Sequence, residues 1–66
     1  MNVIINDQLM EFDKHITITD LLILLNQKTF GTAIAVNKIV IPKNQWNCYF
    51  INDKDNILLF QVISGG

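Results

Sequence analysis

The most constraining feature of the sequence is an apolar run close to its C-terminal end. From Ile57 to Ile63 the only polar residue is Gln61, and a polar turn from Asn52 to Asn56 precedes the run. A strand that is apolar on both faces is typical of a central, covered position in a sheet. We therefore expect the rest of the chain to fold around this strand.

Two β-hairpins are expected upstream of the apolar run. Short β-branched segments flank turn-forming residues, which is the usual signature of a hairpin. Asn37-Lys38 suits a two-residue turn because Asn tolerates positive φ. Pro42 ends the second hairpin and begins a short turn or 3₁₀ segment over Lys43 to Trp46. The expected strands of the two hairpins are residues 3–5 with 9–12, and 33–36 with 39–41.

One helix is expected between the hairpins. Thr17 followed three residues later by Asp20 resembles a capping box. Ile23 and Leu24 widen the apolar stripe, which predicts a helix that is well covered. We expect the helix to end near Gln27 or Lys28, with Gly31 releasing the chain. The stripe itself follows helical spacing and comprises Ile18, Leu21, Leu22 and Leu25.

This order of elements predicts the fold class. At 66 residues, half of them apolar, the chain can form one domain with a dense core. A hairpin, a helix, a hairpin and a final strand are buried economically as one sheet with the helix across one face. We therefore predict an α+β fold of the β-grasp type (the ubiquitin-like roll), with a mixed sheet of four to five strands. The expected domain is 1–63, followed by a flexible Gly-Gly tail, 64–66.

The charge pattern excludes several classes of partner. The net charge is −1, the chain has no Arg, and its five lysines are scattered singly, so no basic patch is available for nucleic acid. No apolar stretch reaches the length of about 20 residues that crosses a bilayer, and no export signal is visible. A single cysteine fits a reducing compartment. These features predict a cytoplasmic protein that does not bind membranes and is a monomer on its own.

The chain closes with Ser64-Gly65-Gly66 directly after the apolar run. Glycine has no Cβ, so such a tail can enter a channel that is too narrow for side chains. A terminal carboxylate becomes an electrophile once AMP is transferred to it, and a sulfur nucleophile can then form a thiocarboxylate. The alternative is that Gly-Gly is a frayed end or a remnant of the expression vector, since terminal residues are usually poorly ordered.

The remaining chemically interesting residues have simpler explanations. Cys48 could relay sulfur, but free cysteine usually behaves as a small buried hydrophobe, and no cation or second cysteine activates it. His15 lies in a polar loop without a catalytic partner, and one His with one Cys cannot form a tetrahedral metal site. Trp46 could be a binding hot spot, although anchoring the short turn is the simpler role. Asp53 and Asp55 are expected to be solvated turn residues rather than metal ligands.

Four segments together resemble the ThiS family of sulfur carriers, and the resemblance extends from the first strand to the last residue. The closing segment is more specific than a Gly-Gly pair alone. The segments are Asn6-Asp7-Gln8, Ala35-Val36-Asn37, Ile41 to Trp46, and Asp53 and Asp55 leading into Ile57 to Gly66.

The resemblance implies a carrier protein of thiamin biosynthesis rather than an enzyme. In that family a ThiF-type adenylyltransferase uses Mg-ATP to activate the terminal glycine, and a cysteine desulfurase supplies the sulfur for delivery to thiazole synthase. Gly66 would then carry the thiocarboxylate, and Gly65 would let the tail enter partner sites. Phe60 matches an apolar interface residue of the small subunit of molybdopterin synthase. We expect a docking surface formed on one face of the last strand by Leu58, Phe60 and Val62.

Three alternatives remain open at this point. A molybdopterin-type carrier shares the tail chemistry but has another acceptor. A ubiquitin-like modifier would use the adenylated glycine to form isopeptide bonds. A β-grasp interaction module would have a chemically idle tail. No cofactor or metal is expected to be bound by the chain itself.

Overall fold

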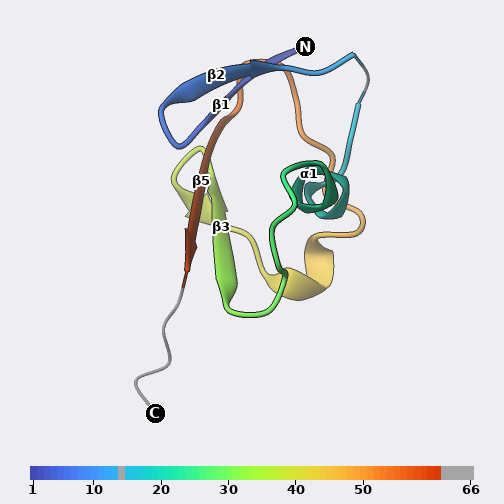
Figure 1. Ribbon diagram of the computed structural model, residues 1–66, viewed down its shortest axis with the longest axis vertical. Helices are drawn as coiled ribbons and strands as arrows, with labels where there is room; N and C mark the ends of the chain where they lie inside the picture. Colours follow the sequence, from blue (N-terminus) through green and yellow to red (C-terminus); the bar gives the residue numbers. More distant parts are fainter. Residues whose placement is uncertain (14, 62–66) are drawn as a thin grey trace.

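The final strand, β5 (Asn56–Gln61), lies at the centre of a five-stranded mixed sheet in the computed structural model (Figure 1). The structure describes residues 1–13 and 15–61. The strand order is β2-β1-β5-β3-β4, so the predicted central position is confirmed. Residues 62 and 63, which the apolar run was expected to include, lie outside the described residues.

The two predicted hairpins flank β5. β1 (Asn2–Ile5) pairs antiparallel with β2 (Gln8–Glu11) and parallel with β5. On the other side of β5, β3 (Thr32–Val36) pairs antiparallel with β5 and with β4 (Ile39–Val40). The mixed sheet is therefore made of two hairpins that meet through the last strand.

Both hairpins turn on Asn. Asn6 and Asp7 have φ of 48° and 66°, and Asn37 and Lys38 have φ of 51° and 72°. Two successive residues with positive φ are typical of the type I′ turn, whose twist matches that of the strands. Asn enters this region more readily than most residues because its short polar side chain bonds locally. The turn predicted at Asn37-Lys38 is confirmed.

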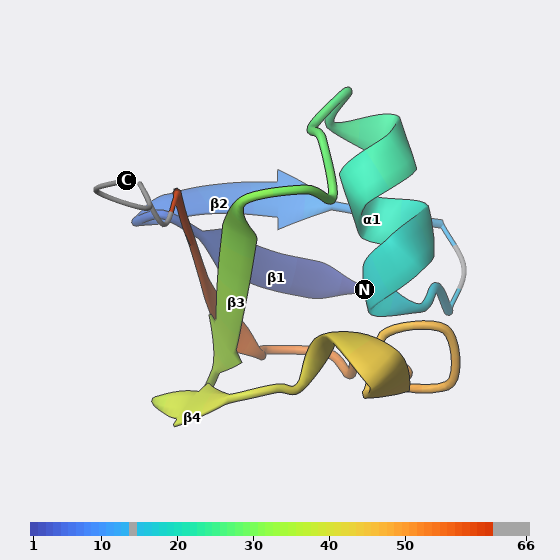
Figure 2. The ribbon, with the colours of Figure 1, turned by 90° about the horizontal axis from the view of Figure 1, so that it is seen from below.

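Helix α1 (Ile18–Leu24) packs across one face of the sheet (Figure 2). The predicted capping box is confirmed: the Asp20 N–H donates to Thr17 Oγ1 at 3.2 Å, and the Thr17 N–H donates to Asp20 Oδ2 at 3.1 Å. Ile18, Leu21 and Leu22 are fully buried against the sheet. Each bond satisfies an amide at the start of the helix that has no partner within it.

The helix ends earlier than predicted. Leu25 is the C-cap and Asn26 has φ of 56°. The Asn26 N–H donates to the Ile23 carbonyl and the Gln27 N–H donates to the Leu22 carbonyl, which is a Schellman motif. The predicted end near Gln27 or Lys28 is wrong because Asn26 supplies the left-handed residue that stops the helix.

The expectation that the helix is well covered is also wrong. Ile23 is 71% exposed and Leu24 is 61% exposed. The helix contacts the sheet through Ile18, Leu21 and Leu22. Ile23 and Leu24, which widen the apolar stripe, therefore face outward.

The core lies between α1 and the inner face of the sheet. Trp46, which directly follows η1 (Lys43–Gln45), belongs to this core. Its indole is buried and its Nε1–H donates to the Ile41 carbonyl at 2.9 Å. The predicted anchoring role of Trp46 is therefore confirmed. The other buried apolar residues of this cluster are Val3, Ile5, Ile16, Ile18, Leu21, Leu22, Ile34, Val36, Ile41, Ile51 and Ile57.

Asp55 differs from its prediction as a solvated turn residue. It is buried, and its carboxylate accepts the Asn52 N–H at 2.8 Å and the Asn37 Nδ2–H at 3.0 Å. Asp53 is exposed and accepts the Asn2 N–H. Asp55 therefore joins the turn before β5 to the turn of the second hairpin.

The cap provides a test of the fold. Thr17→Ala is expected to lower the free energy of unfolding by about 1 kcal/mol, because the Asp20 amide loses its side-chain acceptor. Urea denaturation followed by circular dichroism measures this difference. Thr29→Ala is the matched control, since Thr29 is exposed and its side chain makes no cap. Equal stabilities of the two variants would contradict this account of the helix start.

Candidate functional site

The sheet has one face that α1 does not cover (Figure 2), and exposed apolar side chains of β5 lie on that face. Strand register identifies its members. Leu58 is opposite Ala35, which is opposite Val40, and Phe60 is opposite Ala33. Paired residues share a face and alternate with buried neighbours such as Ile34 and Ile57. We call this surface the open face; it consists of Ile4, Leu9, Ala33, Ala35, Val40, Leu58 and Phe60.

The exposure of the open face is unusual for a central strand. Leu58 is 43% exposed and Phe60 is 45% exposed, whereas Ile57, which points to the opposite face of the same strand, is fully buried. The exposure of Leu58 and Phe60 agrees with the expectation that one face of the last strand is left uncovered. Their partners on β3 have small side chains: Ala33 is half-buried and Ala35 is buried beneath its neighbours. Contiguous exposed apolar side chains of this kind mark interaction sites.

The predicted site residues fall into two groups. Leu58 and Phe60 lie side by side on the open face, and their exposure is as expected for docking residues. Val62, Gly65 and Gly66 lie outside the described residues, as does the predicted tail 64–66. The structure thus describes the strand that leads to the tail.

A shallow pocket lies at the end of β5 from which the chain continues to its tail. Asn6 reaches it from the β1–β2 turn, and the Leu59 N–H donates to Asn6 Oδ1 at 2.9 Å. The pocket has no ionisable side chain among its lining residues, so it offers amide and hydroxyl groups beside an apolar wall. It is lined by Asn6, Gln27, Thr32, Leu59, Phe60 and Gln61.

The other candidate residues do not form a reactive cluster. Cys48 is exposed rather than buried, and its Sγ–H donates to the Gln45 carbonyl at 3.4 Å. His15 is exposed in a shallow pocket shared with Asp20, Ile23 and Leu24. Within residues 1–13 and 15–61, no group of three His, Cys, Asp or Glu side chains could hold a metal ion. In the same ranges, no helix is long and apolar enough to span a membrane.

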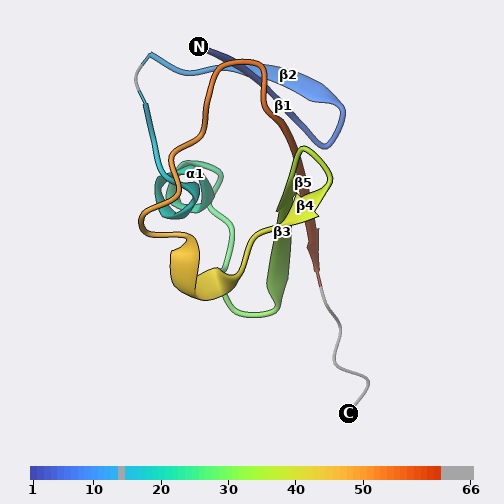
Figure 3. The ribbon, with the colours of Figure 1, turned by 180° about the vertical axis from the view of Figure 1, so that it is seen from behind.

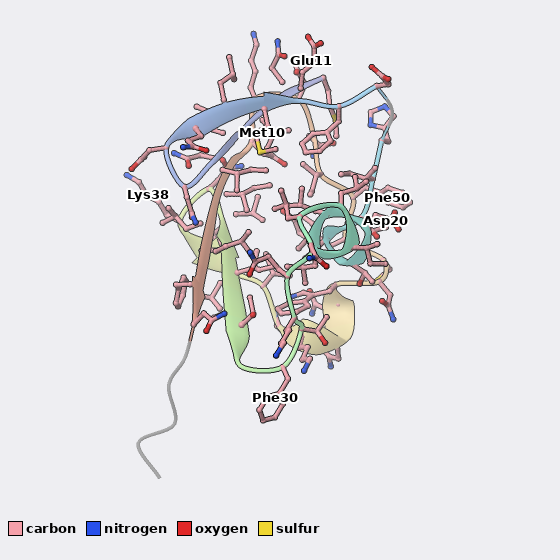
Figure 4. All side chains as sticks on the ribbon, viewed as in Figure 1. Met10, Glu11, Asp20, Phe30, Lys38 and Phe50 are labelled. Atoms are coloured by element: carbon pink, nitrogen blue, oxygen red, sulfur yellow. The ribbon has the colours of Figure 1, made fainter. Side chains whose placement is uncertain are left out.

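Sequence reasoning missed several exposed apolar residues. Leu9 and Val40 belong to the open face and are 71% and 61% exposed. Their exposure depends on strand register, which their own short segments do not reveal. Phe30 is 88% exposed and projects from the loop before β3 (Figure 4). A large aromatic side chain within the polar stretch Gln27 to Gly31 was the signal that could have identified it.

Comparison with solved structures confirms the fold. The crystal structure of the thiamine biosynthesis protein ThiS from Geobacter metallireducens matches with a TM-score of 0.88 at 20% identity, over all of both chains. A solution structure of a thiamine biosynthesis protein from the same organism matches with a TM-score of 0.78 at 19% identity, over all of this chain and 88% of the other. The five-stranded mixed sheet with one helix is thus a β-grasp fold, as predicted.

The fold defines a small ubiquitin-like protein with an apolar open face. A model of the ThiS family matches residues 3–66. The sulfur carrier protein ThiS of Escherichia coli (strain K12) is 42% identical over 66 residues, which is the whole length of both chains. The chain therefore belongs to the ThiS family, and the resemblance found in the sequence is confirmed.

Proposed function

We propose that this chain carries sulfur as a thiocarboxylate on Gly66 and donates it to thiazole synthase in thiamin biosynthesis. The observation that carries the proposal is the full-length identity of 42% to a protein named as a sulfur carrier. The family match also extends through Gly65 and Gly66. Together they favour a carrier whose chemistry takes place on its last residue.

The proposed chemistry starts at the Gly66 carboxylate. One of its oxygens attacks the α-phosphorus of Mg-ATP in the active site of a ThiF-type adenylyltransferase, and pyrophosphate leaves. A persulfide supplied by a cysteine desulfurase then attacks the carbonyl carbon, and AMP leaves. A thiol such as excess cysteine cleaves the resulting acyl disulfide, which releases the thiocarboxylate and a new disulfide. Gly66 has no side chain to hinder the attack, and Gly65 keeps the tail narrow enough to enter the active site.

The open face provides the proposed docking surface for these partners. Leu58 and Phe60 expose apolar area and pair with the small residues Ala35 and Ala33 of β3. Burying such area against a partner is favourable by roughly 25 cal/mol per Å² before the costs of association. Val62 is proposed to extend this surface by its alternation with Leu58 and Phe60. Docking on β5 would direct the residues after Gln61 toward the partner's active site.

Intact-mass spectrometry tests the proposal directly. The protein is incubated with Mg-ATP, a ThiF-type adenylyltransferase, a cysteine desulfurase and cysteine. The expected result is a mass gain equal to the replacement of one oxygen by sulfur, and no gain when ATP is omitted. Addition of thiazole synthase with its other substrates should return the original mass. An unchanged mass, while the same enzymes load another carrier, would reject the proposed function.

A further inference from the structure

The side chain of Asn6 accepts a backbone hydrogen bond from β5 at a position where a longer β1 would otherwise supply the acceptor. β1 pairs with β5 only at Ile4 with Asn56 and at Ile5 with Ile57. The chain then turns away at Asn6, whose φ is 48°. The Asn6 N–H donates to the Ile57 carbonyl at 3.0 Å, and its Oδ1 accepts the Leu59 N–H at 2.9 Å. Asn6 thereby continues the ladder by one amide beyond the end of β1.

Beyond this point, β5 pairs with a strand on one side only among the residues that the structure describes. β5 runs past the β1–β2 turn with β3 alongside it (Figures 1 and 3). The pairing with β3 continues through Ala33 with Phe60 and Thr32 with Gln61. On the β1 side, the Asn6 side chain supplies the last described hydrogen bond to β5. A strand held along one edge frays more readily than a strand held on both, and local opening is most frequent near such ends.

We infer that Asn6 is a positioning residue for the sulfur-transfer tail, an inference that rests on the proposed function. By holding the Leu59 amide, it supports on the β1 side a part of β5 that β3 alone would otherwise hold. The seven residues that follow Leu59, up to Gly66, can span at most about 25 Å when extended. The reacting carboxylate is at the far end of this stretch of sequence, so fraying of β5 at Leu59 is expected to reduce the precision with which a partner can position it. Misplacement of a reacting group by about 1 Å can lower a rate about 100-fold.

Asn37 provides an internal control at the opposite end of the same strand. It too is the first residue of a hairpin turn with positive φ, and its Oδ1 accepts the Asn56 N–H at 2.9 Å. Its backbone N–H donates to the Asn56 carbonyl at 2.8 Å. Asn6 and Asn37 thus make the same kind of contact with β5, but Asn37 holds the start of the strand and Asn6 holds the part nearest the tail.

The experiment compares Asn6→Gly, Asn6→Asp and Asn37→Gly in sulfur loading by the ThiF-type adenylyltransferase. Glycine keeps the positive φ and removes the acceptor, whereas Asp keeps both. Asn6→Gly is expected to lower kcat/KM about fivefold or more, in line with the loss of one hydrogen bond. It should also speed hydrogen exchange of the Leu59 amide. Asn6→Asp and Asn37→Gly should each have a kcat/KM and a Leu59 exchange rate close to those of the original protein.

The outcomes separate this inference from the proposed function. Equal kcat/KM for Asn6→Gly and the original protein would overturn the positioning role while leaving the carrier function intact. An equal loss in Asn37→Gly would also overturn it, because the effect would then follow general stability. If the original protein is not loaded with sulfur, the proposed function fails. Unchanged hydrogen exchange of the Leu59 amide in Asn6→Gly would overturn the contact on which the inference rests, whatever the loading result.

Discussion

Deletion of Gly66 is expected to abolish sulfur loading and to leave the free energy of unfolding unchanged. The truncated chain would end one residue earlier, so its carboxylate would fall about 3.5 Å short of the adenylating centre. Reacting atoms must approach to about 3–3.5 Å, so a shortfall of this size prevents reaction. The described core extends no further along the sequence than Leu59, which is why stability should not change. Intact mass and urea denaturation measure the two quantities.

Ser64→Ala is the matched control for this deletion. It changes the tail next to Gly65 but keeps its length, so loading should equal that of the original protein. A Gly66-deleted protein that gains the mass of sulfur at the original rate would contradict the assignment of Gly66. Loss of loading in Ser64→Ala as well would indicate a requirement for the tail sequence rather than for the position of the last carboxylate.

The second large effect is expected on the open face. Replacing Leu58 and Phe60 together by Gln should weaken binding to the ThiF-type adenylyltransferase by about 30-fold or more. An apolar anchor at the centre of an interface contributes about 2 kcal/mol when truncated, and each 1.4 kcal/mol is about tenfold in affinity. Both side chains are almost half exposed, so the fold itself should be retained. Isothermal titration calorimetry gives the Kd, and circular dichroism confirms folding.

The helix offers a control with the same chemistry on the other side of the molecule. Ile23 and Leu24 are exposed apolar residues of α1, and their joint replacement by Gln removes comparable apolar surface. Binding should be unchanged in this variant. Equal weakening by the helix pair, or unchanged binding by the Leu58 and Phe60 pair, would show that the open face is not the docking surface.

Local signals in the sequence were sufficient for most of the fold. Thr17 and Asp20 mark the start of α1 through a bond pattern that spans only three residues. Asn37 marks a hairpin turn through its own tolerance of positive φ. The central position of β5 could be predicted because apolar residues on both faces of a strand favour neighbours on both edges. Each of these features depends on residues that are close together in the sequence.

The errors arose where distant contacts decide the outcome. Asp55 is buried because Asn37, 18 positions away in the sequence, donates to its carboxylate, and the turn sequence alone gives no sign of this. Ile23 and Leu24 resemble core residues but face outward, because the sheet is already covered by the preceding side chains of α1. The open face was predicted through Leu58 and Phe60, whereas its extension to Leu9 and Val40 follows only from strand register.

The position of β5 in the sheet has a consequence for the synthesis of the protein. β5 is the last strand to leave the ribosome, yet it joins the β1–β2 hairpin to the β3–β4 hairpin. An isolated hairpin is marginally stable at best in water, so the nascent chain cannot complete its sheet until Asn56 to Gln61 have been translated. A product of interrupted translation that stops before β5 would be left as two unsupported hairpins, which proteases degrade. Completion of the sheet therefore requires translation of the strand that precedes the proposed carrier tail.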